Sequence, residues 1–133
     1  MGAAPTLRVA RPVGDLARSR RMYVEGLGLS VLGGFENHAG FDGVMLGVPG
    51  TGWHLEFTVC RHHPVAPAPT AEDLLVFYHP VADDWQAACA RLLSAGFAEV
   101  PAFNPYWNQG GRSFADADGY RTVLYHGLWP PAT

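Results

Sequence analysis

The stretch that decides the fold is VGDLARSRRMYVEGLGL, residues 13–29. It predicts a helix over Leu16–Glu25, because Asp15 is placed as an N-cap whose side chain accepts a hydrogen bond from the first turn. The helix is expected to end in the run Gly26-Leu27-Gly28, since glycine readily adopts the left-handed conformation that closes a helix. These two signals give the first helix its predicted bounds.

The same pattern returns 68 residues further along the chain. There Val81-Ala82-Asp83 precedes a predicted helix over Asp84–Ala95, and Gly96 follows it. Apolar residues recur in this segment at helical spacing and form one stripe. The stripe consists of Trp85, Ala88, Cys89, Leu92 and Leu93. The chain therefore contains two copies of one structural unit.

Short apolar or alternating runs surround both helices and predict three strands after each helix and one before it. The clearest is Trp53–Val59, where His54, Glu56 and Thr58 share one face. The segment Arg61–Thr70 is rich in proline, which disfavours both a helix and a central strand, so it is predicted to be a linker. The expected strands are 6–13, 30–35, 42–48, 53–59, 73–78, 98–103, 112–115 and 121–125, with turns at 36–41 and 116–119 and a loop at 104–111. This predicts an α+β fold of two βαβββ modules.

Composition excludes several classes of protein. The chain has 133 residues, of which 48% are hydrophobic and 16% charged, and its net charge is −3. These values exclude an intrinsically disordered chain, and they leave no basic surplus for binding nucleic acid or an anionic membrane. No apolar run is long enough to span a bilayer, and two cysteines do not make a disulfide framework. A cytoplasmic location is expected.

Three runs resemble the vicinal oxygen chelate superfamily, the group of glyoxalases, bleomycin-resistance proteins and extradiol dioxygenases. They are residues 13–29, HLEF (54–57) and FADADGYRTVLY (114–125). The resemblance is strongest to small uncharacterised bacterial members. It implies a single domain over residues 1–133, with module one at about 6–59, a linker at about 60–72 and module two at about 73–127. It also implies a U-shaped mixed sheet around a trough for a small molecule, and a homodimer.

The superfamily's enzymes hold one divalent metal in that trough. The resemblance places the ligand positions at Arg8, at Glu56, at Asp73 or Leu74, and at Val123. Arg has no lone pair to give a metal and Val has no donor atom. We therefore expect no cofactor and predict that Arg8 pairs with Glu56. A divalent metal held in a new arrangement by His54, Glu56 and Asp73 stays open.

Other residues are candidates for contact with a ligand. His54 lies two residues from Glu56 and is either an acid/base group or an ordinary strand histidine. Tyr106, Trp107 and Asn108 belong to a loop that either recognises a ligand or folds back as a lid over the core. Arg112 either meets an anionic group of a ligand or pairs with Asp116 or Asp118.

Three functions remain open from the sequence. The favoured one is a metal-independent small-molecule binder of the bleomycin-resistance type, with Arg8, His54, Glu56, Asp73 and the 106–112 region around the ligand. The second is a lyase, isomerase or dioxygenase with a rearranged metal site, in which Glu56 and His54 carry the chemistry. The third is an interaction module whose trough is filled by its own side chains.

Overall fold

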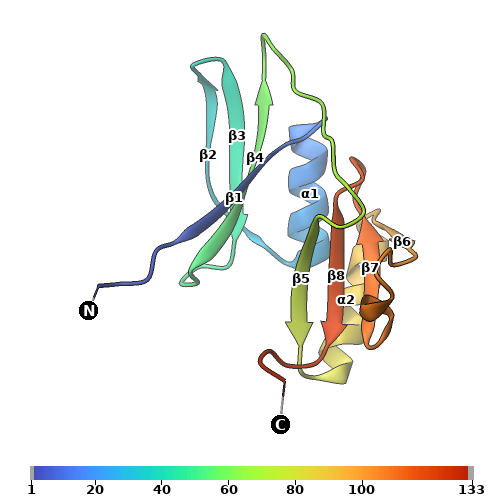
Figure 1. Cartoon of the computed structure of the whole chain (residues 1–133). Coiled ribbons are helices and arrows are strands. Elements are labelled where there is room, and N and C mark those ends of the chain that lie inside the picture. Colours follow the sequence, from blue (N-terminus) through green and yellow to red (C-terminus); the bar gives the residue numbers. More distant parts are fainter. Residues whose placement is uncertain (1, 132–133) are drawn as a thin grey trace. The chain divides into compact units, whose positions relative to one another are not determined.

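The structure is a computed structural model that describes residues 2–131. The chain divides into two compact units, Met1–Pro67 and Ala68–Thr133. The first contains β1 (Leu7–Pro12), α1 (Leu16–Leu27), β2 (Ser30–His38), β3 (Phe41–Gly47) and β4 (Trp53–Cys60). Its sheet has the order β1-β4-β3-β2, in which only the β1–β4 pair is parallel (Figure 1).

The second unit repeats this topology. It contains β5 (Leu74–His79), α2 (Ala82–Ser94), β6 (Ala98–Val100), the 3₁₀ helix η1 (Pro105–Asn108), β7 (Gly111–Ala115) and β8 (Arg121–His126). Its strand order is β5-β8-β7-β6, again with one parallel pair, β5–β8. Each unit is therefore a βαβββ module with its own four-stranded mixed sheet, which confirms the predicted α+β fold.

Helix α1 begins and ends as the sequence predicts. The Asp15 carboxylate accepts a hydrogen bond from the backbone N–H of Arg18 at 3.0 Å, and Gly28 has φ = 70°. A cap of this kind stabilises a helix by about 1 kcal/mol. The buried face of α1 packs on β3 and β4, where the Tyr23 and Phe57 rings meet edge to face at 4.7 Å. This contact anchors α1 to one face of the first sheet.

Helix α2 differs from the prediction at its start. It begins at Ala82, two residues early, and its N-cap Val81 makes no side-chain hydrogen bond. Asp83 and Asp84 instead lie in the first turn, where a carboxylate interacts favourably with the helix dipole. Leu93 was placed in the buried stripe and is 45% exposed, so that assignment was wrong. The helix packs on β8, and Trp85 Nε1 donates to the Leu124 carbonyl at 2.8 Å.

Two strands end three residues away from their predicted ends. β2 continues to His38, and the turn is confined to Ala39 and Gly40, which have positive φ. β6 ends at Val100 rather than Phe103, because Pro101 lacks the N–H that a ladder needs.

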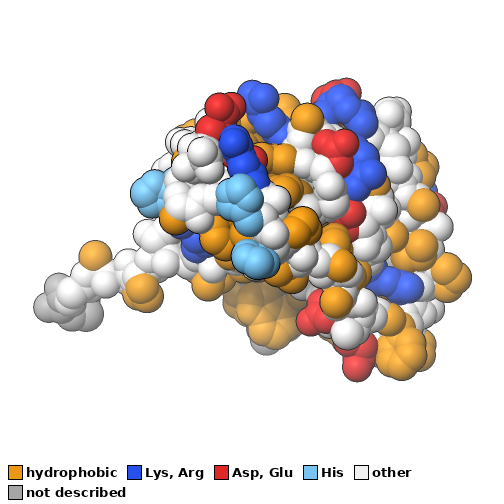
Figure 2. Space-filling view, turned by 90° about the horizontal axis from the view of Figure 1, so that it is seen from above, with side chains coloured by type: hydrophobic (Ala, Val, Ile, Leu, Met, Phe, Trp, Pro, Cys, Tyr) orange, Lys and Arg blue, Asp and Glu red, His pale blue; other side chains and the backbone are white. Residues whose placement is uncertain are grey.

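In the described part of the chain, no helix is both long enough and apolar enough to cross a membrane. Blue and red side chains are interspersed on the face shown in Figure 2, so this face has no extended patch of one sign.

An ion pair ties the end of the first sheet to the following segment. Arg61 donates to the Asp42 carboxylate from Nε at 2.9 Å and from Nη2 at 2.8 Å, and the N–H of Asn37 donates to Asp42 Oδ1 at 2.9 Å. The Arg61 N–H also donates to the Gly40 carbonyl at 2.8 Å. These contacts fix the β2–β3 hairpin against the start of the linker.

The same ion pair predicts sensitivity to acid. The hydrogen bond from Arg61 lowers the pKa of Asp42 below its ordinary value of 3.8. The contribution of Asp42 to stability is therefore complete above that value and is lost as the pH falls through the lower pKa of the folded state. In urea unfolding, the difference between wild type and Asp42→Asn should be largest at about pH 7 and should shrink below about pH 4. A difference that does not change with pH would contradict this.

Candidate functional site

A polar cluster lies on the face of the first sheet that α1 does not cover. In the parallel β1–β4 pair, Arg8 is in register with His54, and Glu56 follows two residues later on the same face. Arg8 Nε donates to His54 Nε2 at 2.9 Å, and Arg8 Nη1 lies 3.1 Å from Glu56 Oε2. The predicted pairing of Arg8 with Glu56 is therefore confirmed, and His54 is part of the same cluster.

The cluster has donor groups that are not used within it. Because His54 Nε2 accepts a hydrogen bond from Arg8, Nδ1 is the ring nitrogen that can donate. The Glu56 side chain is 13% exposed and that of Arg8 is 48% exposed. Arg8 Nη2 and His54 Nδ1 have no hydrogen-bond partner among the described residues. The cluster therefore presents N–H donors to solvent, while its carboxylate is engaged by the guanidinium.

The positions that would hold a metal in relatives do not suit one in this chain. Asp73 accepts hydrogen bonds from the Thr70 N–H at 3.1 Å and the Thr70 hydroxyl at 2.6 Å, so it closes the turn before β5. Leu74 and Val123 have no donor atom, and Val123 is fully buried. Across residues 2–131, no three His, Cys, Asp or Glu side chains come together. With Arg8 bonded to Glu56 as well, this set of residues does not fit a divalent metal.

The second module carries a cavity on the Val123 face of its sheet. The β5–β8 register pairs Leu74 with Arg121 and Val76 with Val123, so these four side chains share one face. The cavity has a volume of about 340 Å³. Its lining is Ala71, Glu72, Leu74, Val76, Ala102, Phe103, Asn104, Trp107, Ser113 and Arg121. It combines an apolar floor with a guanidinium and the indole of Trp107.

The 104–111 loop folds back onto this face. Asn104 Oδ1 accepts from the Tyr106 N–H at 3.0 Å and starts the η1 turn. Trp107 is half-buried, and its ring centroid lies 6.0 Å from that of Tyr125. Tyr106 is 53% exposed and stacks on Tyr125, with 6.4 Å between the ring centroids. Asn108 is exposed at the end of η1. Trp107 therefore folds back towards the sheet, as the lid interpretation expects, and contact of this loop with a ligand stays a prediction.

Arg112 lies on the other face of the second sheet. It is in register with Leu124, and its guanidinium makes two hydrogen bonds to Glu99, at 2.9 and 2.7 Å. These bonds lower the pKa of Glu99. The predicted partners Asp116 and Asp118 were wrong, since the Asp116 carboxylate accepts from the N–H groups of Asp118 and Tyr120 within the hairpin turn.

The sequence interpretation missed several residues of the cavity, among them the charged residue Arg121. Its Nη1 donates to the Pro101 carbonyl at 3.0 Å, and its side chain shares the face of Val123. Alternation along β8 could have found it, because residues 121 and 123 must point the same way.

Comparison with known proteins agrees with this architecture. The YycE-like N-terminal domain matches residues 7–58 and the YycE-like C-terminal domain matches residues 72–126. The uncharacterised protein YycE of Bacillus subtilis (strain 168) is 45% identical over 121 residues, which are 91% of this chain and 87% of that protein.

Two solved structures extend the comparison. The crystal structure of a YycE protein of unknown function from Bacillus subtilis, a candidate glyoxalase/fosfomycin resistance protein, has a TM-score of 0.87 at 43% identity and covers 94% of this chain and 91% of that chain. A glyoxalase/bleomycin resistance protein from Streptomyces sp. CB03234 has a TM-score of 0.60 at 25% identity, covering 91% and 99%. The chain therefore belongs to the YycE-like family, which has the glyoxalase fold of the vicinal oxygen chelate superfamily.

Proposed function

We propose that the protein binds a small molecule without a metal, in the manner of the bleomycin-resistance branch of its superfamily. The observation that carries this proposal is the pair of contacts from Arg8 to His54 and Glu56. A guanidinium stands where relatives would place a metal ligand, and it engages the carboxylate that a metal would need. The positive charge at this position is then supplied by the protein itself.

The free donors of the cluster indicate the chemistry of the ligand. Arg8 Nη2 and His54 Nδ1 offer N–H groups, so the ligand should carry acceptor oxygens such as those of a carbonyl or carboxylate. The cavity beside Trp107 in the second unit is a separate candidate surface, with an apolar wall and the Arg121 guanidinium. A flat molecule with polar oxygens at its edge suits either surface.

Binding is favoured over catalysis because the basic atoms are occupied. His54 Nε2 accepts from Arg8, and Glu56 is held in an ion pair. Either group would have to lose its partner before it could take a proton from a substrate. The alternative is a lyase, isomerase or dioxygenase that uses Glu56 and His54. It is supported by the position of Glu56 beside His54 on one face of β4.

A homodimer and a cytoplasmic location complete the proposal. The dimer rests on the resemblance to the superfamily alone. The location is supported by Cys60 and Cys89, which are both free thiols, as is usual in a reducing compartment.

The test is a thermal-shift screen of bleomycin, fosfomycin and small aromatic carboxylic acids, run in EDTA, with affinities then measured by calorimetry. We expect a compound that binds with the chelator present. Arg8→Met should weaken that binding about 10- to 100-fold, the usual effect of losing a hydrogen bond to a charged group. Arg8→Lys should recover only part of it, because Lys lacks the planar fork.

The control is Arg91→Met, an exposed arginine of α2, which should leave the affinity unchanged. Binding or turnover that appears only when a divalent metal is added would overturn the proposal and favour the enzyme.

A further inference from the structure

The cavity of the second unit, about 340 Å³ in volume, contains a buried hydroxyl group without a partner. Ser113 lines this cavity and is only 5% exposed. Its hydroxyl makes no hydrogen bond to any of residues 2–131. Buried polar side-chain atoms are in large majority hydrogen-bonded, so an unbonded hydroxyl in the wall of a cavity is a point at which a ligand atom can be held.

Arg121 brings a positive charge to the same place. The strand order β5-β8-β7-β6 puts β7 between Arg121 on β8 and the end of β6. Arg121 starts opposite Ala115 of β7. Its Nη1 donates at 3.0 Å to the carbonyl of Pro101, which follows Val100, the residue opposite Ser113. The side chain of Arg121 therefore extends diagonally over β7 towards Ser113, and both residues line the cavity.

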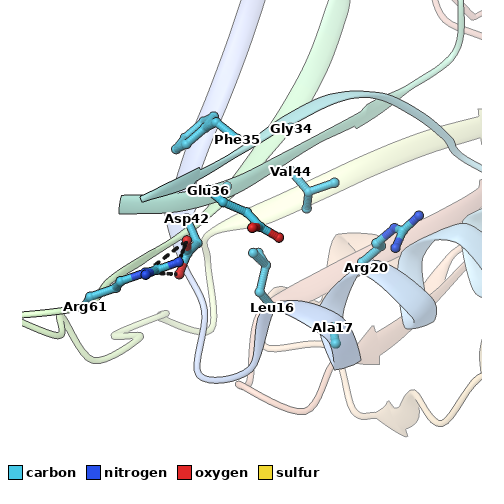
Figure 3. Close-up of a pocket in the computed structure, with 10 residues that line it drawn as sticks. Leu16, Ala17, Arg20, Gly34, Phe35, Glu36, Asp42, Val44 and Arg61 are labelled. Atoms are coloured by element: carbon cyan, nitrogen blue, oxygen red, sulfur yellow. Dashed lines mark hydrogen bonds and ion pairs between the residues drawn. The ribbon is translucent and has the colours of Figure 1, made fainter. Parts of the chain in front are cut away.

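The guanidinium keeps one complete edge for a ligand. Only Nη1 of Arg121 is used, so Nε and Nη2 have no partner among the described residues. Nε and Nη2 are the pair through which Arg61 holds the Asp42 carboxylate (Figure 3) and Arg112 holds Glu99. Such an edge fits the two oxygens of a carboxylate with parallel hydrogen bonds.

No carboxylate of the described chain occupies this edge. Glu72 also lines the cavity, but it is exposed and forms no ion pair with Arg121 within residues 2–131. The positive charge of Arg121 is therefore not compensated inside the cavity, and it lies beside the Ser113 hydroxyl, which can donate a further hydrogen bond.

The walls of the cavity are apolar and held in place. Leu74 and Val76 of β5 line it on the sheet side. The Trp107 ring stands edge to face against Tyr106 and Tyr125, with centroids 5.0 and 6.0 Å apart, so its orientation is fixed from two sides. An aromatic ring packs well beside such a side chain. The volume is at the lower end of the range for small-molecule sites, so it suits a compact ring system.

We propose that this cavity binds an aromatic carboxylate. The carboxylate accepts hydrogen bonds from Nε and Nη2 of Arg121 and from the Ser113 hydroxyl. The aromatic ring lies in the apolar part of the cavity, beside Trp107.

This site is independent of the cluster on which the proposed function rests. None of Arg8, His54 and Glu56 lines the cavity, and every residue that does belongs to the second unit. Binding at one site can therefore fail while binding at the other is found.

The probe is 2-naphthoate, titrated into the full chain by isothermal calorimetry at about pH 7, where its carboxyl is ionised. We expect saturable binding, with NMR shifts at the Ser113 amide and the Trp107 indole N–H. Arg121→Met should weaken binding about 10- to 100-fold, and Arg121→Lys should recover part of it. Ser113→Ala should weaken it about three- to tenfold.

Two controls separate recognition of the carboxylate from loss of folding and from plain apolar binding. Arg91→Met, at an exposed arginine of α2, should leave the affinity for 2-naphthoate unchanged. The neutral amide 2-naphthamide should bind wild type at least about tenfold more weakly than 2-naphthoate, and Arg121→Met should remove most of this preference. A merely destabilised protein would lose affinity for both compounds alike.

The proposal is overturned if 2-naphthoate does not bind at about 10 mM, or if the amide binds as tightly as the acid. It is also overturned if Arg8→Met weakens the binding of 2-naphthoate and Arg121→Met does not. That last result would place the ligand at the Arg8 cluster and support the proposed function.

Discussion

Val123→Glu is expected to remove about 3–5 kcal/mol from the free energy of unfolding, the usual cost of an unpaired buried charge. Val123 is fully buried, and its Cγ1 would lie 3.3 Å from a Cβ placed on Gly111. A carboxylate at this position has no contact with solvent in the tight space beside Gly111. The loss is comparable to the whole stability of many small domains, so the variant should be only marginally folded.

The effect of this substitution should depend on pH with a defined sign. Burial raises the pKa of the introduced carboxyl above its unfolded value of about 4.3. The loss of unfolding free energy relative to wild type should therefore be smallest below that pH and should grow as the pH rises. Urea unfolding from about pH 4 to pH 8 measures it.

Val123→Gln is the matched control for charge. Gln has nearly the same shape as Glu and cannot ionise. The loss of unfolding free energy in this variant should therefore not change over the same pH range. If the Glu and Gln variants are equally stable at about pH 8, Val123 does not occupy the closed apolar site described above. The result bears on function, because the family resemblance places a metal ligand at this position.

Gly111→Ala is expected to cost about 1–3 kcal/mol, the usual range for overpacking. A Cβ at this position would overlap the carbonyl oxygen of Trp107, which is backbone and cannot move alone. The η1 segment would have to lift from β7, and Trp107 forms part of the cavity wall. We therefore expect faster hydrogen exchange over 105–108 together with a lower urea midpoint.

Gly52→Ala is the control for adding a methyl group to glycine. A Cβ there meets nothing within 4 Å, so stability should stay within about 0.5 kcal/mol of wild type. Equal effects of the two substitutions would contradict the close contact between β7 and η1.

The first helix shows why local signals predicted so much of the fold. Asp15 and Gly28 act within one turn of their own positions, so their roles follow from residue type and spacing. The β1–β4 and β5–β8 pairings join strands far apart in the chain, and no local signal predicted them. The start of α2 was misplaced because its N-cap is Val81, a residue type that carries no capping signal.

The cluster around Arg8 was partly predictable. Alternation along β4 placed His54 and Glu56 on one face, and the resemblance brought Arg8 to the same site. The bond from Arg8 to His54 was not anticipated, because it depends on the register between β1 and β4. Arg112 was misjudged for a similar reason, since its partner Glu99 is on β6 and is reached only across the ladder.

By itself, the sequence determined the two helices, the order of the strands along the chain and the repeat. Capping and periodicity act between residues that are close along the chain. The sequence also determined that Arg and Val occupy two positions where a metal would need donors. Only the tertiary structure decided which polar groups are already bonded, which are free, and where the cavities lie. Those properties depend on strand register and on packing between residues far apart in the chain, and no local pattern encodes them.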